Sequence, residues 1–472
     1  MKRIEATDAA FLDVERPNTP PLIGALIVLD PATAPGSFVR HRDILSYLDR
    51  RLHLAPNLRK RLMFSPLKLD EPVLVDDENF DLEFHVRHIG LPRPRDRRQL
   101  GILAARLMSR PMDVHRPLWE LYVIEGLEDV DGVPADAFAI LIKLHHAAFD
   151  GAAGAAAIWA LMQAAPDAEP EPPAQPWVPE RAPGVAQWAV GAMFANARQW
   201  VENAAALTTL GERAVRGALA ARDDPAGLTA PRTRFQAAVS SHRVLDWVIF
   251  PLSEFKAMRA RLGRPKMNDL VLTIIAGALR RYLERHGENP GRSLVAMCPI
   301  NVRGAGDALE GGNKVTAMRV AIGTDIADPV ERLAAIQRSS MQGKEQAEQL
   351  GGTFFADLLA LTPYAVRGRV MRGVTAAAER TDQRFAMANL VVTNVPNPPG
   401  DWYFAGSKFL AYAAFGPMSP GLGLFHVVTG MDWEMSISVT STREIMPDIA
   451  DYIDDLRASY EEVRAIDLMG DS

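Results

Sequence analysis

Residues 137–144, Ala-Phe-Ala-Ile-Leu-Ile-Lys-Leu, form an almost unbroken apolar run that ends at His145 and His146. Such a run is typical of a strand that is buried on both faces of a sheet. The Gly- and Ala-rich continuation over residues 151–162 has the composition of a helix. The two histidines are therefore predicted to lie in a turn between a strand and a helix, where rigid elements hold side chains at a cleft.

The residues of this turn are suited to proton transfer. The unperturbed pKa of histidine is about 6.5, so its side chain can take a proton from an alcohol or amine and return it later. Neighbours on an extended segment point in opposite directions, so only one of His145 and His146 is expected to face a substrate. Asp150 is expected to orient the turn through an arginine or backbone N–H groups, and Gly151 allows close backbone approach.

Composition excludes several classes of protein. With 472 residues and 48% hydrophobic content, the chain has enough apolar material for two domains. Its net charge of −6 argues against a nucleic-acid partner. The single cysteine, Cys298, excludes a disulfide or a Cys-Cys zinc framework, and without a His-Glu-x-x-His motif no metal is expected. Neither a signal peptide nor a membrane-spanning run is visible, which favours a cytoplasmic protein with at most peripheral membrane contact.

Other catalytic motifs are missing. The segment 417–421 lacks the first glycine of a Gly-x-Ser-x-Gly nucleophile elbow. There is no Gly-x-Gly-x-x-Gly after a strand and no phosphate loop. The sequence therefore does not favour a serine hydrolase, hydride transfer or phosphoryl transfer.

The pattern His145-His146-x-x-x-Asp150-Gly151 resembles the signature of the CoA-dependent acyltransferase superfamily, which includes chloramphenicol acetyltransferase, BAHD acyltransferases and condensation domains. Within that superfamily, further segments are similar to the bacterial wax ester synthase/diacylglycerol acyltransferase family. These are the N-terminal segment 8–12, Pro117-Leu118-Trp119, Asn268-Asp269, residues 299–304 and residues 390–396. The resemblance covers nearly the whole chain and is weakest over residues 165–235.

The resemblance implies an α/β fold of two chloramphenicol-acetyltransferase-like domains, each a mixed sheet flanked by helices, with the active site at their interface. The halves are expected at residues 1–165 and 234–472. Between them, residues 166–183 contain seven prolines, so residues 166–233 are predicted to be a Pro-rich and then helical linker. Residues 184–222 are expected to form either a connecting helix or an amphipathic helix that rests on a membrane or lipid droplet.

The resemblance also implies roles for individual residues, although structural roles remain open for most of them. It favours His146 as the general base, with His145 structural or supporting, and makes Asn268 a possible oxyanion donor. Pro117, Leu118, Trp119, Asp269 and Asn394 are expected to bind substrate or shape the cleft, and Arg59, Arg61 or Arg303 to pair with Asp150. The alternatives are a helix cap for Asn268 and Asp269, a solvated basic face for residues 58–62, and ordinary strand packing for the others.

The function implied is a long-chain acyl-CoA-dependent O-acyltransferase that makes triacylglycerol from diacylglycerol, wax ester from a fatty alcohol, or both. Acyl-CoA is then a substrate, and no permanently bound cofactor is expected. Two alternatives stay open. One is a condensation-type transferase that acts on a soluble or carrier-bound acceptor, and the other is a non-catalytic acyl-CoA or lipid-binding protein.

Periodicity predicts most of the remaining elements. Besides the strand at 137–144, strands are expected at 22–29, 244–250, 293–300, 313–322, 408–415 and 422–440. Besides the helix at 151–162, helices are expected at 38–53, 98–108, 252–262, 268–285 and 328–350, with a closing helix from 447 to about 466.

Overall fold

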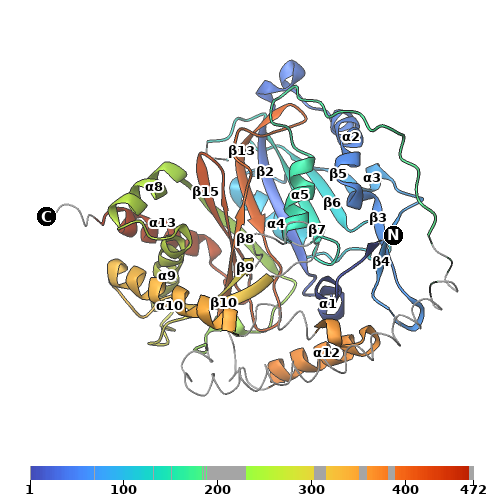
Figure 1. Cartoon of the computed structure of the whole chain (residues 1–472). Helices are drawn as coiled ribbons and strands as arrows, with labels where there is room; N and C mark the ends of the chain where they lie inside the picture. The colour runs from blue at the N-terminus through green and yellow to red at the C-terminus, as the bar shows by residue number, and fades with distance from the viewer. Residues whose placement is uncertain are drawn as a thin grey trace. The chain divides into compact units, whose positions relative to one another are not determined.

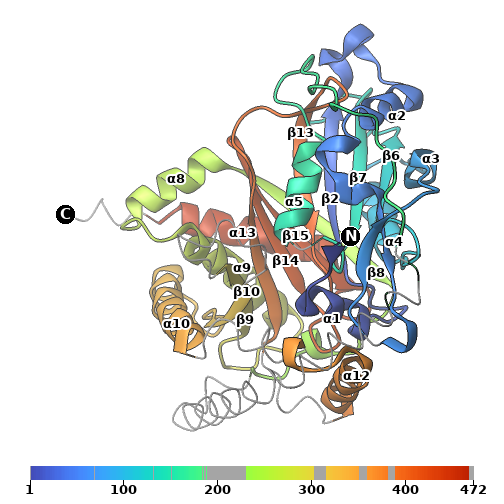
Figure 2. The ribbon, with the colours of Figure 1, turned by 45° about the vertical axis from the view of Figure 1, so that its right-hand side comes forward.

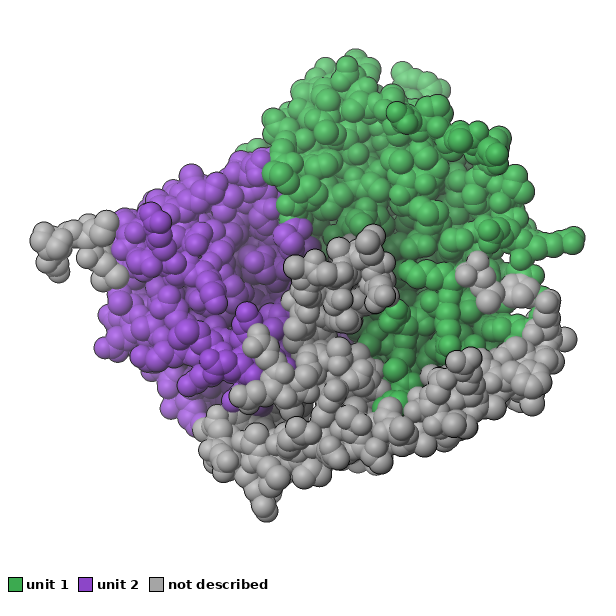
Figure 3. All heavy atoms as spheres, in the orientation of Figure 1, with its two compact units in different colours: residues 1–205, 359–372, 397–417 green, residues 206–358, 373–396, 418–472 purple. Residues whose placement is uncertain are grey.

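A computed structural model of the chain describes residues 2–68, 70–130, 132–149, 151–182, 184, 188, 230–301, 315–349, 359–380 and 388–466. The chain forms two compact units, coloured separately in Figure 3. The first comprises residues 1–205, 359–372 and 397–417, and the second comprises residues 206–358, 373–396 and 418–472. This division differs from the expected halves, because two segments from the C-terminal part of the sequence belong to the first unit.

A six-stranded mixed sheet forms the centre of the first unit (Figure 1). Its strands, in spatial order, are β12 (Tyr403–Phe404), β13 (Ser407–Phe415), β2 (Leu22–Asp30), β7 (Phe138–His145), β6 (Trp119–Glu125) and β5 (Val86–Gly90). Only the β5–β6 pair is parallel. Every residue of β7 is buried, as its apolar sequence predicts. Its one charged residue, Lys143, lies opposite Glu120 and donates to the Glu120 carboxylate at 2.9 Å.

Two helices cover opposite faces of this sheet. Gly24 of β2 lies against Met108, the last residue of α4 (Arg97–Met108), and a Cβ at Gly24 would meet the Met108 sulfur at 2.7 Å. Ile23, which precedes Gly24 in β2, contacts Gly154 of α5 (Gly151–Ala160). Because successive strand residues point to opposite faces, α4 and α5 lie on opposite sides of β2.

Smaller elements complete the first unit. Helix α1 (Ala6–Val14) precedes β2, and α2 (His41–Asp49) and the short α3 (Leu82–His85) follow it. A three-stranded sheet has the order β1 (Lys2–Arg3), β4 (Val73–Asp76) and β3 (Lys60–Met63). Helix α12 (Tyr364–Arg380), of which residues 364–372 belong to this unit, lies beside α1 in both ribbon views, although the two are far apart in the sequence (Figures 1 and 2).

The second unit has its own six-stranded mixed sheet. The spatial order is β10 (Val315–Ala321), β9 (Val295–Asn301), β11 (Leu390–Pro396), β14 (Phe425–Gly430), β15 (Glu434–Thr442) and β8 (Arg243–Pro251). Four helices lie on one side of it: α8 (Leu252–Arg261), α9 (Met267–Arg285), α10 (Pro329–Gln349) and α13 (Ile449–Arg464) (Figure 2). Thirteen of the 19 residues of α9 are buried, which makes it the central helix of this core.

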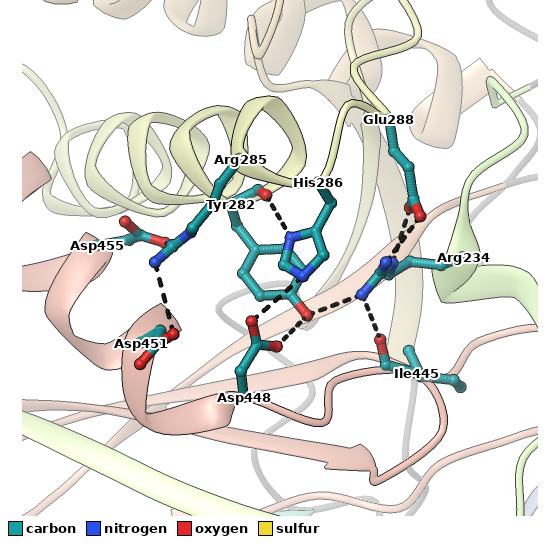
Figure 4. Close-up of polar contacts among 9 residues, drawn as sticks. All are labelled: Arg234, Tyr282, Arg285, His286, Glu288, Ile445, Asp448, Asp451 and Asp455. Atoms are coloured by element: carbon teal, nitrogen blue, oxygen red, sulfur yellow. Dashed lines mark hydrogen bonds and ion pairs between the residues drawn. The ribbon is translucent and has the colours of Figure 1, made fainter.

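A polar network at the C-terminal end of α9 joins that helix to α13 (Figure 4). The Tyr282 hydroxyl donates to Asp448 at 2.7 Å and accepts from Arg234 at 3.0 Å. Arg234 also binds both carboxylate oxygens of Glu288 at 2.7 Å. Bidentate pairing of this kind fixes both position and orientation, so the network holds the first described segment of the second unit against the end of its central helix.

Each expected element outside residues 184–222 has a counterpart in the structure, and the main differences are the following. The segment 422–440, expected as one strand, contains two strands, β14 and β15, joined by a turn at residues 431–433. Helix α12 was not expected. Helix α9 begins at Met267 with Lys266 as its N-cap, so the cap role considered for Asn268 and Asp269 is wrong. Most of the predicted helix at 184–222 lies outside the described residues.

Among the helices that the structure describes, none is both long enough and apolar enough to span a lipid bilayer.

Candidate active site

The turn after β7 is held by backbone hydrogen bonds from separate segments. The N–H of His145 donates to the carbonyl of Leu118, and the N–H of His146 donates to the carbonyl of Pro21, both at 3.0 Å. The His145 carbonyl accepts from the N–H groups of Ala148 and Phe149, each at 3.1 Å. These bonds fix the backbone on which both imidazoles stand, and they bring the Pro117–Trp119 segment next to the histidines.

His145 is completely buried, and its ring has a protein group near each nitrogen. Nδ1 accepts the N–H of Ala147 at 3.1 Å, so a neutral ring carries its proton on Nε2. Nε2 lies 3.5 Å from a carboxylate oxygen of Glu15, the residue that follows α1. The ring is therefore oriented by contacts within the protein and is closed to solvent.

His146 is partly exposed, in contrast to its neighbour. Its imidazole stacks on the phenyl ring of Phe11 from α1, with centroids 3.9 Å apart and planes inclined by 25°. A stacked aromatic ring covers one face of an imidazole and restricts its rotation. This arrangement gives the turn one buried histidine and one histidine that solvent reaches.

The segment Pro117-Leu118-Trp119 is buried at the start of β6. The Trp119 indole N–H donates to the carbonyl of Leu58 at 2.7 Å, and its ring stacks on His85 with centroids 4.7 Å apart. Leu118 packs in a cluster with Ile4, Ala9, Leu62, Leu74 and Tyr364. These contacts make the segment a packed wall that adjoins His145 through the Leu118 carbonyl.

The arginines expected to pair with Asp150 have other neighbours in the structure. Arg59 lies 3.8 Å from the carboxylate of Asp49 and stacks over the Trp177 ring. Burial lowers the pKa of the Arg59 guanidinium, while the carboxylates of Asp49 and Asp76 oppose that shift. Arg61 lies 3.8 Å from Asp77. Asp150 and Arg303 are outside the described residues, and Gly151 is the first residue of α5.

The remaining expected residues belong to the second unit. Asn268 is partly exposed in the first turn of α9. Asp269 is buried and accepts the Ser340 hydroxyl at 2.9 Å, and burial raises the pKa of its carboxyl group. Asn394 is exposed on β11, opposite Val428 of the parallel strand β14. Asp269 thus fixes the helix turn from which Asn268 projects, whereas Asn394 has the exposure of an ordinary strand-end residue.

Phe11 and Glu15 were not expected as site residues. They stand more than 120 positions before the histidines, and no local pattern links them to the turn. The only available signal was the resemblance of residues 8–12 to the start of a known family, which placed Phe11 in a shared segment without giving it a role.

The sequence profile of the wax ester synthase/diacylglycerol acyltransferase catalytic domain matches residues 4–271, and the profile of the C-terminal domain of that family matches residues 311–464. The chain belongs to the wax ester synthase/diacylglycerol acyltransferase family. It is an acyltransferase of this type, and the histidine turn, α1 and the Pro117–Trp119 segment all lie in the part matched by the catalytic profile.

Relatives in the family cover almost the whole chain. A candidate diacylglycerol O-acyltransferase of Mycobacterium tuberculosis (strain CDC 1551 / Oshkosh) is 31% identical over 98% of this chain and 90% of its own length. Another candidate of the same activity, from Mycobacterium bovis, is 30% identical over 98% of this chain and 99% of its own length. The family assignment therefore rests on the full chain, beyond the histidine motif.

Solved structures support the fold. The wax ester synthase/diacylglycerol acyltransferase of Marinobacter aquaeolei VT8 superposes with a TM-score of 0.67 at 23% identity and covers 98% of each chain. A trichothecene 15-O-acetyltransferase of Fusarium sporotrichioides superposes with a TM-score of 0.59 at 12% identity, covering 98% of this chain and 95% of its own. The predicted pair of mixed-sheet domains flanked by helices is confirmed by these neighbours.

Proposed function

We propose that this family member transfers a long-chain acyl group from acyl-CoA to the hydroxyl of diacylglycerol or of a fatty alcohol, forming triacylglycerol or wax ester. The observation that carries the proposal is the environment of His146. It is the solvent-accessible member of a histidine pair, on a backbone fixed by hydrogen bonds and against the ring of Phe11. A general base needs this combination of access and orientation.

In the proposed reaction, His146 takes the proton of the acceptor hydroxyl as its oxygen attacks the thioester carbonyl carbon. A C–O bond forms, and the carbonyl electron pair moves onto oxygen. When the pair returns, the C–S bond breaks and the thiolate of CoA takes the proton from His146. No acyl-enzyme forms, so no activated serine or cysteine is needed. General-base catalysis of this kind contributes about 10²- to 10⁴-fold, and binding and orientation supply the rest.

The neighbours of His146 have supporting roles in this proposal. His145 is too buried to meet a substrate, and it stabilises the turn through Ala147 and Glu15. Asp150 and Gly151 are proposed to set the geometry of the turn, as the family signature implies. Arg59, Arg61 and Arg303 remain proposed partners of Asp150, although Arg59 and Arg61 have the carboxylate neighbours described above.

Asn268 is the proposed donor to the negative charge that develops on the carbonyl oxygen. A neutral amide donates without titrating, and the N-terminal turn of a helix adds partial positive charge. The bond from Ser340 to Asp269 holds this turn in place. Asn268→Ala should lower kcat with little change in the KM for acyl-CoA. Asn289→Ala is the matched change at a partly exposed asparagine that has no proposed role.

The acceptors are water-insoluble, so the proposal includes peripheral contact with a membrane or lipid-droplet surface. Liposome flotation of the full chain beside a variant that lacks residues 184–222 tests whether that segment makes the contact. Unchanged binding by the variant would reject it.

The deciding experiment measures CoA release from palmitoyl-CoA with either diacylglycerol or hexadecanol, with identification of the lipid product. The parent protein and His146→Ala are run side by side. Ester formation that the substitution abolishes supports the proposal and ranks the two acceptors. Palmitoyl-CoA binding without ester from either acceptor would instead indicate another acceptor or a non-catalytic binding protein.

A further inference from the structure

Helix α12 contributes a buried arginine to the region around α1. Nε of Arg367 donates to Asp13 at 2.8 Å, and its two terminal nitrogens donate to the two carboxylate oxygens of Glu71 at 2.5 and 2.8 Å. The side chains of Arg367, Asp13 and Glu71 are 1%, 2% and 8% exposed. Burial alone would lower the pKa of Arg367, but hydrogen bonds and charge from Glu71 and Asp13 raise it above its ordinary value.

The backbone of α12 also approaches Asp13 closely. A Cβ at Gly368 would lie 2.8 Å from a carboxylate oxygen of Asp13, closer than real Cβ atoms come. Tyr364, one turn earlier in α12, packs in the apolar cluster that contains Ala9 and Leu118, and Ala148 of the histidine turn borders this cluster. Helix α12 therefore joins α1 through a buried ion group and an apolar contact, although Arg367 and Asp13 are 354 residues apart in the sequence.

The anchored segment contacts both histidines. Asp13 lies between Phe11, which stacks on His146, and Glu15, which faces Nε2 of His145. A shift of the end of α1 would move both contacts together. The planar fork of Arg367 binds two carboxylates at once, and a lysine, as a point charge, cannot reproduce that geometry.

We infer that Arg367 is a positioning residue for the transfer reaction and holds α1 so that Phe11 and Glu15 keep the histidine pair in place. This inference rests on the proposed role of His146. It assigns to α12, a helix from the C-terminal part of the sequence, a function in the geometry of the N-terminal turn.

The test uses Arg367→Lys in the full chain. We expect kcat to fall about 10- to 100-fold with the KM for palmitoyl-CoA within about twofold, because small misplacements of a catalytic group cost rate more than binding. The same substitution in a Phe11→Leu background should have a much smaller effect, since both changes disturb one contact. Gly368→Ala is the milder second variant, which displaces Asp13 without removing charge and serves if Arg367→Lys does not fold.

Arg332→Lys is the matched control. Arg332 is also 1% exposed, but it lies in the core of the second unit, where it donates to the carbonyls of Ile326 and Ala327. The Arg332→Lys substitution should lower the melting temperature without a selective loss of kcat. Its effect should be the same in the parent protein and in the Phe11→Leu background. If Arg367→Lys behaves in the same way, the positioning role is overturned and the ion group is structural only.

A spectroscopic readout separates this inference from the proposed function. In protein with ¹³C-labelled histidine, the His146 signal is assigned by its absence in His146→Ala and should shift in Arg367→Lys but not in Arg332→Lys. If His146→Ala keeps full turnover while Arg367→Lys shifts the His146 signal, the general-base proposal fails. The inference that Arg367 positions His146 through α1 then stands. If His146→Ala is inactive and Arg367→Lys leaves both the signal and kcat unchanged, only the positioning inference fails.

Discussion

The phenyl ring of Phe11 lies against the imidazole of His146, with 3.9 Å between ring centroids. This contact joins a helix near the start of the chain, α1, to the turn that follows β7. His146 remains partly exposed beside this contact. Phe11 lies outside the family signature, and its stacked ring restricts how the imidazole can turn.

Replacement of Phe11 by leucine should lower kcat about tenfold, because the imidazole loses its stacking partner and samples more orientations. Steady-state kinetics with palmitoyl-CoA would measure this. Phe80→Leu is the matched control, since Phe80 also stacks on a histidine, His85, with centroids 5.4 Å apart. Equal losses in both variants would contradict a specific role for Phe11.

Glu15→Gln keeps the size of the side chain but removes the charge that faces His145 Nε2. The buried ring then loses the negative charge that faces Nε2, so we expect kcat to fall about threefold to tenfold with little change in KM. Kinetics across the neutral pH range would test this. Glu5→Gln alters an exposed acid at the other end of α1 and should leave kcat as in the parent protein.

Trp119→Phe should destabilise the first unit by about 1–3 kcal/mol, because the buried carbonyl of Leu58 loses its donor. Urea unfolding would measure the change in the free energy of unfolding. Trp402→Phe offers a comparison, since the Trp402 indole also donates to a carbonyl, that of Pro398 at 3.1 Å, from a partly exposed position. A larger loss at Trp402 than at Trp119 would rule out this reasoning.

His426 should make the stability of the second unit depend on pH. Burial lowers the pKa of His426 from 6.5 to about 3. Between these two pH values, the imidazole is protonated in the unfolded chain but neutral in the folded chain. The free energy of unfolding should therefore fall as the pH drops from 6.5 towards 3, by at most about 1.4 kcal/mol per pH unit.

Urea titrations at a series of pH values would show this slope, and His426→Gln should reduce it. His115→Gln, a change at an exposed histidine of the first unit, should leave the slope as it is. A slope that survives in His426→Gln would assign the effect to other groups.

Helices and strands whose residues show a clear hydrophobic pattern could be predicted from the sequence. The apolar run before His145 predicted β7, and the Gly- and Ala-rich stretch after it predicted α5. Helix α12 was not predicted, because its buried face carries the charged residue Arg367. The carboxylates that pair with Arg367, those of Asp13 and Glu71, are far away in the sequence. The contacts of Phe11 and Glu15 with the histidines likewise depend on tertiary packing, which residue spacing does not encode.

The candidate site was predictable to a similar extent. The motif gave the pair His145 and His146, but not which partners orient them. The proposed pairing of Asp150 with Arg59 or Arg61 remains a prediction, and both arginines have carboxylate neighbours closer in sequence. Where several arginines and carboxylates follow one another along the chain, many pairings are nearly equivalent, so sequence alone ranks them poorly.

Strand β13 pairs with β2 in antiparallel register from Lys408 opposite Asp30 to Phe415 opposite Gly24. A ribosome must therefore pass residue 407 before β2, which pairs with β7 on its other side, receives its second neighbour. Until then β2 presents an unpaired edge, a surface prone to association with other chains. A fragment that ends at the proline-rich segment would lack β13 and keep that edge open, so we expect it to associate with other chains more readily than the whole protein.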